Sequence, residues 1–181
     1  GDRALLDRLG LSAPMPSTYG DMLGLVERNK APNKLDVFLN RTHTYDVTWD
    51  PDDGARTATL TSTYTNDVKD PAALPPVVVG NESGTLPGTQ IREVAIITPS
   101  QNVSLELDGE RVPVRTDMEQ GYYRHSVGLA IPPGQSVELR WRLEGTLPAG
   151  DYDLTLLRPA NGGTTETNVV AREGDRDVID E

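Results

Sequence analysis

Polar and apolar side chains alternate without a break in the stretch ARTATLTSTYTN, residues 55–66. Threonine occupies every odd position from 57 to 65, while Ala58, Leu60 and Tyr64 share the even positions. Successive side chains of a β-strand leave on opposite faces, so this period of two predicts a strand with one buried and one wet face. β-Branched residues suit the extended backbone, whereas a helix would bring apolar residues back every three to four positions.

The preceding stretch shows the same alternation. Residues 43–49 place threonines and Asp46 on one face and apolar or aromatic side chains on the other: His43, Tyr45, Val47 and Trp49. The sequence DPDDG between the two stretches predicts a hairpin turn. Matching the apolar faces across this hairpin brings both threonine sets onto one wet face, where cross-strand pairs stabilise a sheet by about 0.2–1 kcal/mol each.

Further strand patterns follow at similar spacing through most of the chain. They are IREVAIIT (91–98), NVSLELDG, RVPV, YRHSVGLAI, SVELRWRLE, DYDLTLLR and TETNVVAR. With about eight or nine short strands and turn signals between them, the sequence predicts a mainly β protein. The expected architecture is an antiparallel two-sheet immunoglobulin-like β-sandwich formed by residues 42–172.

The ends of the chain and one long connection depart from this pattern. Residues 1–41 predict a short mixed α/β N-terminal segment, with Leu5, Leu6 and Leu9 at helical spacing and then a strand and a helix within 20–41. This segment is expected either to end a preceding domain or to pack on the sandwich. Residues 173–181 are mostly charged and predict a disordered acidic tail. The connection 66–89 is rich in proline and is expected to add an edge strand or to plug one end of the core at Val77–Val79.

Charge and composition narrow the classes of partner. The net charge is −11, which disfavours nucleic acid and membrane contact by this segment because phosphate backbones and anionic lipids are repelled. The chain has no cysteine, so disulfides and thiolate chemistry are excluded. It begins with Gly1 rather than Met, and we expect it to be part of a longer protein.

The sequence supports no catalytic, cofactor-binding or metal-ligating residue. His43 and His125 fall on inward rows of different strands, where a shared metal is one possibility and a core histidine bonded to the backbone is the commoner outcome. Asp50, Asp52 and Asp53 crowd one turn as calcium ligands do, but DPDDG lacks the alternating acids of an EF-hand loop and is ordinary hairpin chemistry.

Enzymatic motifs are equally weak. The stretch GNESG (80–84) has the wrong spacing for a nucleophile elbow, and nothing selects a converging pair among the 28 acids. Trp49 and Trp141 lie on apolar rows, which indicates core packing rather than stacking on sugars. The threonine grid is a candidate surface for ice or glycan, yet an ice-binding face needs the grid on several adjacent strands, and the other wet faces carry Glu and Arg.

Several longer stretches, taken in order, are similar to a known family. They are NKLDVFLNRTHTYDVTWDPDDGARTATLTSTYTND, LPPVVVGN, LPGT, DGERVPV, the IPPG turn, LEGTLPAGDYDLTL and the closing RP at 158–159. Together they resemble the C-terminal region of actinobacterial proteins of the domain of unknown function 4012 family over most of residues 20–159. The resemblance implies a membrane-anchored protein exposed outside the cell, and it carries over no catalytic residue. After Pro159 the sequence departs from the family pattern.

These observations predict a non-catalytic extracytoplasmic domain of a cell-surface protein, with a structural or protein-interaction role and no cofactor. A carbohydrate-binding module for cell-envelope polysaccharide is the alternative. The expected partner is therefore a protein or an envelope glycan, and neither its identity nor the oligomeric state follows from the residues.

Overall fold

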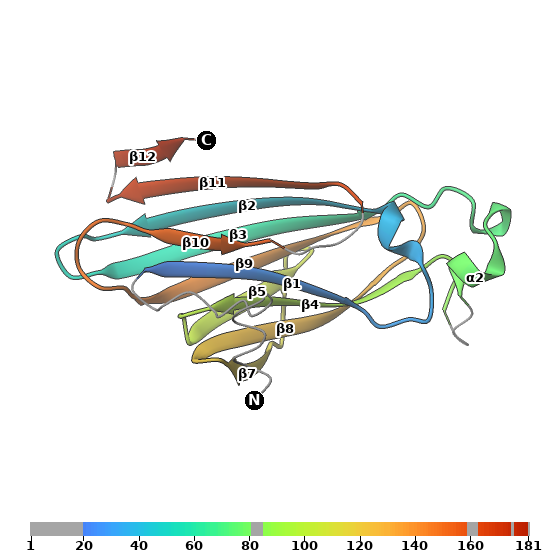
Figure 1. Ribbon diagram of the computed structural model, residues 1–181, viewed down its shortest axis with the longest axis horizontal. Helices are drawn as coiled ribbons and strands as arrows, with labels where there is room; N and C mark the ends of the chain where they lie inside the picture. Colours follow the sequence, from blue (N-terminus) through green and yellow to red (C-terminus); the bar gives the residue numbers. More distant parts are fainter. Residues whose placement is uncertain (1–19, 81–84, 159–162, 175, 181) are drawn as a thin grey trace, which may run out of the picture.

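Two β-sheets pack face to face in the computed structural model, which describes residues 20–80, 85–158, 163–174 and 176–180 (Figure 1). The strands run along the long axis of the molecule, and the turns and short helices gather at its two ends. The chain is therefore mainly β, as predicted from the alternating residues. None of the helices in the described part is long and apolar enough to cross a membrane.

The smaller sheet has five strands in the order β10-β1-β4-β8-β7. Their bounds are Asp21–Asn29 for β1, Gln90–Thr98 for β4, Arg115–Glu119 for β7, Tyr122–Ile131 for β8 and Leu154–Leu157 for β10. β1 lies between β4, with which it pairs antiparallel, and β10, with which it pairs parallel.

The larger sheet has seven strands in the order β12-β11-β2-β3-β9-β5-β6. Their bounds are Leu39–Trp49 for β2, Ala55–Asn66 for β3, Asn102–Leu107 for β5, Glu110–Val112 for β6, Ser136–Thr146 for β9, Thr165–Glu173 for β11 and Arg176–Asp180 for β12. The predicted hairpin of β2 and β3 lies near the centre of this sheet, with β9 beside β3 and β11 beside β2.

Both sheets are mixed, which departs from the expected antiparallel immunoglobulin-like arrangement. The pairs β1–β10 and β2–β11 are parallel, and the other pairs among the described strands are antiparallel. Each parallel pair joins strands from distant parts of the chain, whereas a tight hairpin joins only antiparallel neighbours. Turn signals in the sequence can therefore reveal an antiparallel hairpin such as β2–β3, but they reveal neither a parallel pair nor an antiparallel pair of distant strands such as β3–β9.

The sheets extend beyond the expected sandwich boundaries of 42 and 172. β1, the 3-10 helix η1 (Leu35–Phe38) and the first residues of β2 all come from residues assigned to the N-terminal segment. The order of strand and then helix within 20–41 is as predicted, but β1 is an interior strand of a sheet rather than an attachment to it. Where a disordered tail was expected, residues 176–180 form β12 beside β11. The predicted helix at 3–9 lies outside the described residues.

The long connection between β3 and β4 closes one end of the molecule. It contains the 3-10 helix η2 (Pro71–Ala73) and the short helix α2 (Pro76–Val79) in place of the expected edge strand. Of the expected plug Val77–Val79, Val79 is buried but Val77 is exposed and none of the three joins the main core. The amide of Asn66 fixes the start of the connection by donating to the carbonyl oxygens of Gly88 and Ile131.

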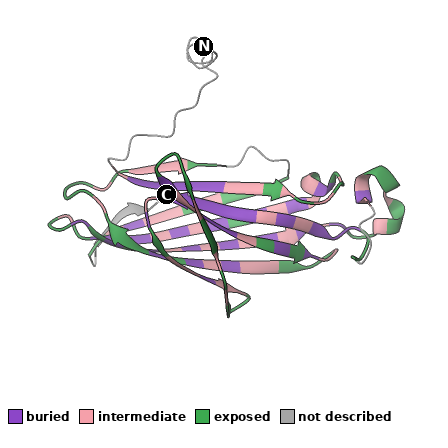
Figure 2. Ribbon diagram, turned by 90° about the horizontal axis from the view of Figure 1, so that it is seen from below, coloured by how far each residue is buried: buried purple, intermediate pink, exposed green. Residues whose placement is uncertain are grey.

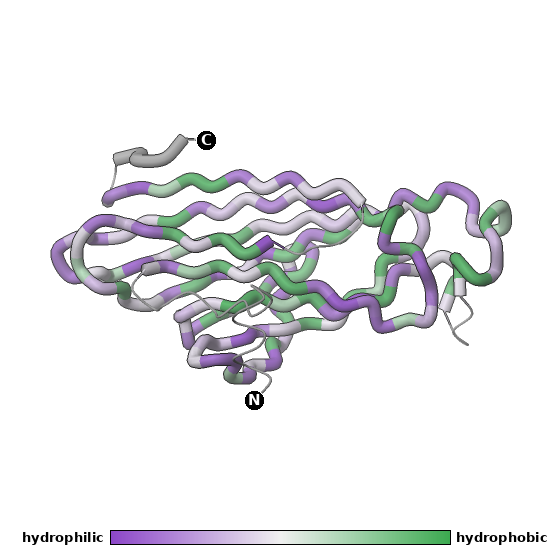
Figure 3. Tube along the Cα trace, viewed as in Figure 1, coloured by the Kyte–Doolittle hydropathy of each residue, from purple (hydrophilic) through white to green (hydrophobic). Residues whose placement is uncertain are grey.

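The main core lies between the two sheets. Buried residues alternate with exposed ones along the strands (Figure 2), and the hydropathy along the chain alternates in the same way (Figure 3). The following predicted inward residues are buried in this core: Tyr45, Val47, Trp49, Leu60, Tyr64, Leu105, Leu129, Ile131, Leu139, Trp141 and Leu143. Burial of apolar area of this kind stabilises the fold by about 25 cal/mol per Å².

Candidate functional site

The outward side of β2 and β3 carries the predicted threonine grid, which we call the threonine face. In the register of the hairpin, Thr42 pairs with Thr63, Thr44 with Thr61 and Thr48 with Thr57. The full outward row of these two strands consists of Asn40, Thr42, Thr44, Asp46, Thr48, Ala55, Thr57, Thr59, Thr61, Thr63 and Thr65. The prediction that both threonine sets share one side is therefore confirmed.

A shallow open depression of about 640 Å³ lies on the threonine face. β2 and β3 line it with their threonines, and β9 borders it with Arg140, Arg142 and Glu144. Of the threonines, Thr59 and Thr61 lie on β3 directly opposite Arg142 and Arg140 of β9. The depression therefore offers hydroxyl and methyl groups at its centre and charged groups along its border.

Three arginines around the depression are paired with acidic side chains. Arg142 donates to Glu106 at 3.4 Å and Arg140 to Glu138 at 3.2 Å, while Arg172 of β11 pairs with Asp46 on the other side. Pairs of this kind in water contribute little to stability, typically well under about 1 kcal/mol. They leave the surface close to electrically balanced, so it lacks the single-sign field that would attract a highly charged ligand.

A different set of polar groups lies buried between the sheets near one end. Asp21 of β1 accepts hydrogen bonds from the hydroxyl groups of Tyr45 at 2.6 Å and Tyr152 at 2.7 Å. Arg56 pairs with the same carboxylate and also donates to Ser100. Burial, followed by the nearby Asp21 carboxylate, raises the pKa of Tyr45 well above its usual value. This closed cluster holds β1 against β2 and β3.

Two further arginines enter the core on inward rows. Arg41 Nε of β2 donates to both carboxylate oxygens of Glu27 of β1, at 2.7 and 2.8 Å, and both side chains are buried. Arg92 of β4 donates to Gln90 and pairs with Asp36 of η1 at 2.6 Å. Burial works against the charged form of Asp36, but the hydrogen bond and charge of Arg92 outweigh it and lower the pKa of Asp36.

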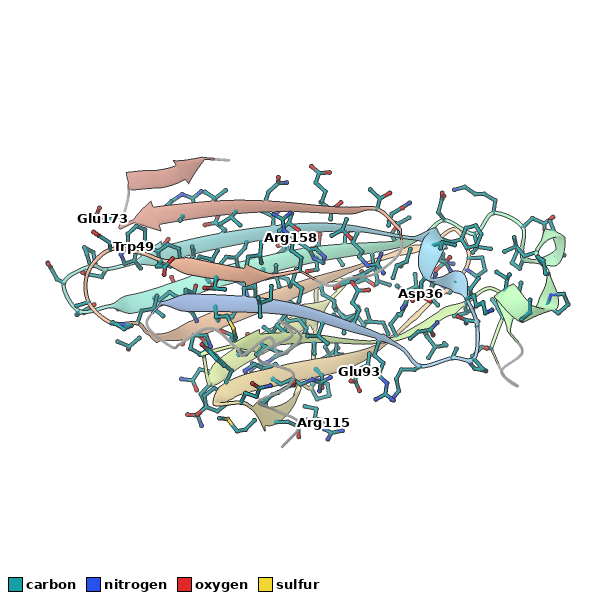
Figure 4. All side chains as sticks on the ribbon, in the orientation of Figure 1. Asp36, Trp49, Glu93, Arg115, Arg158 and Glu173 are labelled. Atoms are coloured by element: carbon teal, nitrogen blue, oxygen red, sulfur yellow. The ribbon has the colours of Figure 1, made fainter. Side chains whose placement is uncertain are left out.

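The two clusters occupy different parts of the molecule. Figure 4 labels Trp49 near one end of the molecule and Asp36 near the other. Trp49 packs on Tyr152 with ring centroids 4.9 Å apart, which places the Asp21 cluster at the end of Trp49. Sequence reasoning missed the inward arginines, although Arg41 and Arg56 fall on apolar rows of the alternating pattern and that parity was the available signal.

The two histidines are buried core residues, each with its own partners. His43 Nδ1 lies 2.9 Å from Ser62 Oγ, and burial together with the charge of Arg41 lowers the pKa of His43 to about 4. His125 bonds to the carbonyl of Ser100 and to Thr116, and burial lowers its pKa. Within the described ranges, no group of three or more His, Asp or Glu side chains gathers as metal ligands would.

The acidic turn between β2 and β3 uses two of its carboxylates to hold the turn. Asp50 accepts from the amide of Asp52, and Asp53 accepts from the amide of Ala55, both at 2.8 Å. These bonds are the side-chain turns that Asp commonly forms with its own backbone. Asp50 and Asp53 therefore have a structural role in the turn, as expected for hairpin residues.

Comparisons with known proteins add little to this geometry. No protein-family model matches the chain, and no curated protein matches its sequence. Among solved structures, it is similar to the crystal structure of a "putative nutrient binding protein" from Legionella pneumophila, with a TM-score of 0.44 and 7% identity. The match covers 70% of this chain and 45% of that chain, so it spans less than half of the other protein. A likeness this weak identifies no function.

Proposed function

We propose that the chain is a non-catalytic β-sandwich domain of a cell-surface protein and that it docks a protein partner through the threonine face. The proposal is carried by one observation, the contrast between an interior whose buried charged groups form ion pairs with one another and an open polar depression on the threonine face. Fixed, well-supported strands present that depression, and rigid presentation suits a docking surface.

The placement of the titratable groups supports a role other than catalysis. An active site places groups with displaced pKa values in an accessible cleft, where substrate reaches them. Here the groups with the largest pKa displacements are His43, Tyr45, Tyr64 and Tyr152, and they pack among core residues. The depression on the threonine face is lined instead by hydroxyl groups and paired ions.

The chemistry of the depression favours a protein over a sugar as partner. Carbohydrate sites commonly stack aromatic rings against sugar faces, but Trp49 and Trp141 are buried in the core. A polar, electrically balanced surface with a few methyl groups resembles an ordinary protein contact surface. One observation supports the second candidate, an envelope polysaccharide: threonine hydroxyls beside Arg140 and Glu144 offer both donors and acceptors to sugar hydroxyls.

The proposed location follows from the residue pattern rather than from the fold. The similarity of residues 20–159 to the C-terminal region of the domain of unknown function 4012 family supports an extracytoplasmic position in a membrane-anchored protein. Protease treatment of intact cells tests this: we expect the domain to be digested while a cytoplasmic marker survives. Complete protection in intact cells, with digestion after lysis, would contradict a surface position.

Site-specific photo-crosslinking tests the docking proposal. A photoreactive amino acid replaces Thr59 at the centre of the depression, and a matched control replaces Met118, an exposed residue on β7 of the other sheet. On intact source cells we expect a discrete protein adduct from position 59 and none from position 118. An adduct to polysaccharide from position 59 would favour the second candidate, and equal labelling at both positions would contradict both.

A further inference from the structure

The strand β8 has neighbours on both sides along only part of its length. β4 pairs with all but its first residue, whereas β7 pairs with it from Tyr122 to Ser126. Figure 1 shows the short β7 beside one end of the longer β8. The chain enters β7 at Arg115 directly after Val114, which packs against the main core. Residues 127–131, which we call the open edge, therefore have no neighbouring strand on that side among the described residues.

Two residues of the open edge turn their backbone hydrogen-bonding groups away from the sheet. The amide of Lys30 donates to the carbonyl of Ile91 at 2.9 Å, so the backbone groups of Ile91 face β1. Directions alternate along an antiparallel ladder, so the next residue of β4 turns its groups to its partner Leu129 on β8. Gly128 and Ala130, on either side of Leu129, therefore turn their N–H and C=O groups to the open side, and both residues are exposed.

The open edge is firmly held and carries no charge. Leu129 and Ile131 are buried in the main core, and Val127 packs against it. The sequence of the open edge, VGLAI, has no charged residue and no proline, whereas the edge strand β7 reads RTDME. Charged side chains and prolines are the usual devices that prevent an edge from pairing with another strand. The open edge therefore retains the ability to pair.

A shallow depression of about 490 Å³ lies along the open edge. The small residues of the open edge line it together with Lys30 and Arg115. Glu93, an acidic residue of the lining, is bound by Arg124 at 2.5 Å, and Figure 4 shows Glu93 and Arg115 on this side of the molecule. Arg115 pairs with Asp117 at 3.0 Å, an exposed pair of the kind that is weak in water. The depression thus offers two cationic side chains on a chain whose net charge is −11.

We propose that the open edge binds an extended segment of a partner protein by strand addition, and that an acidic side chain of this segment faces Lys30 and Arg115. In strand addition, main-chain hydrogen bonds give affinity and side-chain contacts give specificity. The backbone groups of Gly128 and Ala130 bond to the backbone of the segment, and the two cations bind its carboxylate. This surface belongs to the five-stranded sheet and is separate from the threonine face.

A second copy of the chain fits the open edge less well than an acidic segment does. Residues 127–131 contain no acidic side chain, so two paired open edges would bring no carboxylate on the added strand to Lys30 and Arg115. Two chains that each carry a net charge of −11 also repel one another. The charges therefore favour a different chain as the source of the added strand.

Amide hydrogen exchange, followed by NMR on the whole chain, tests whether the edge is open. We expect the amides of Gly128 and Ala130 to exchange at least about tenfold faster than that of Leu129, which is bonded within the sheet. Equal protection of the three amides in the chain alone would overturn the proposal, because another segment or a second copy would already be paired with the edge.

Binding of a synthetic peptide tests the recognition. The peptide is a blocked, fluorescent heptapeptide with alternating threonine and valine and an aspartate at each end, and the control peptide has lysine in place of aspartate. We expect saturable binding of the acidic peptide that slows exchange at Gly128 and Ala130, and at least about tenfold weaker binding of the basic peptide. Equal binding of both peptides, or no saturable binding of the acidic one at millimolar concentration, would overturn the proposal.

Substitutions locate the bound peptide. Ala130→Pro removes an N–H that faces the open side, so binding of the acidic peptide should weaken at least about tenfold. Met118→Pro makes the same change in the edge strand β7 and should leave the affinity unchanged. Lys30→Glu with Arg115→Glu keeps the backbone intact and should also weaken binding at least about tenfold. An affinity that survives the charge reversal, or that falls equally in Met118→Pro and Ala130→Pro, would overturn the proposal, and thermal melting shows that each variant is folded.

Discussion

The outer faces of the two sheets differ in chemistry although both belong to one sandwich. The seven-stranded sheet turns threonines and paired ions outward around an open depression, while the five-stranded sheet turns Met22, Ile97 and Tyr122 outward and buries them. The alternation of polar and apolar residues explains the polar outer side of the seven-stranded sheet, because each strand turns one polar row to water. The second face has apolar residues on both rows of its strands, which is the pattern of a strand covered on both sides.

This difference gives the domain an orientation. The outer side of the seven-stranded sheet is polar along its centre, whereas the outer side of the five-stranded sheet combines a closed apolar cluster with the Glu93–Arg124 ion pair. The apolar cluster is therefore inaccessible to a partner, while the depression on the threonine face is open to one. The same kind of substitution should therefore change the free energy of unfolding by different amounts on the two faces.

The largest difference is expected from placing the same charge on each face. Ile97→Asp puts a carboxylate into the buried apolar cluster that Met22, Ile97 and Tyr122 form on the outer side of the five-stranded sheet. It should lower the free energy of unfolding by about 4 kcal/mol, since a buried unpaired charge is among the costliest changes. Thr61→Asp puts it opposite Arg140 on the wet face and should change it by no more than about 0.5 kcal/mol. Urea unfolding at pH 7 measures both, and losses of similar size would show that the two faces are equally covered.

The layer between the faces should contribute a pH dependence of its own. His43 has a pKa of about 4 in the fold, against 6.5 for an ordinary histidine, because burial and Arg41 disfavour the charged form. Below pH 6.5 the unfolded chain takes up a proton that the folded chain refuses, so stability falls as the pH falls. Between pH 7 and pH 5 we expect a loss of about 2 kcal/mol from this residue.

Urea titrations at several pH values in that window check the histidine effect. His43→Asn keeps a side-chain amide near Ser62 and cannot titrate, so its stability should depend less steeply on pH than that of the parent. Thr61→Ala, on the wet face, should retain the parental slope. An unchanged slope in His43→Asn would show that His43 is as easily protonated in the fold as in the unfolded chain.

Two glycines of the five-stranded sheet, Gly24 and Gly128, differ in the space available for an added side chain. A Cβ at Gly24 would lie 3.1 Å from the Cβ of Ile97, so Gly24→Ala overpacks the apolar cluster and should cost about 1–2 kcal/mol. At Gly128 the nearest atom is 4.0 Å away and the residue is exposed, so Gly128→Ala should be neutral or stabilising by up to about 1 kcal/mol. Thermal melting of the pair measures both, and a stabilised Gly24→Ala would place Gly24 outside the tight contact.

The sequence predicts the interior of this fold better than its edges. Period-two burial identifies β2, β3, β8 and β9 and the correct inward row of each, because a one-residue slip would expose the whole apolar set. It does not identify β10 as the parallel partner of β1, since that pairing depends on the return path of a distant segment. Parallel neighbours have no turn between them to reveal the contact.

The polar groups of the candidate site also differ in how far the sequence predicts them. The threonine face follows from two adjacent stretches and one turn, so the residues suffice to assemble it. The buried pairs of Arg41 with Glu27 and Arg56 with Asp21 depend on β1, which lies across the sandwich from β2 and β3. An inward arginine shows in the alternation, but its partner is fixed by the packing of the two sheets.

The smallest change in stability is expected from removing hydroxyl groups on the threonine face. Thr59→Val with Thr61→Val keeps the β-branched shape and removes only hydroxyl groups that water otherwise solvates, so stability should change by no more than about 0.5 kcal/mol. If the hydroxyl groups bind a partner, the same double variant should lose the crosslink formed on intact cells by a photoreactive residue at neighbouring Thr44. Its melting temperature should stay at the parental value. Thr65→Val, at the end of the row near Ser136, is the matched control and should keep the crosslink. A double variant that melts several degrees lower would assign these threonines to the stability of the sheet, and one that keeps the full crosslink would remove their hydroxyl groups from the proposed docking surface.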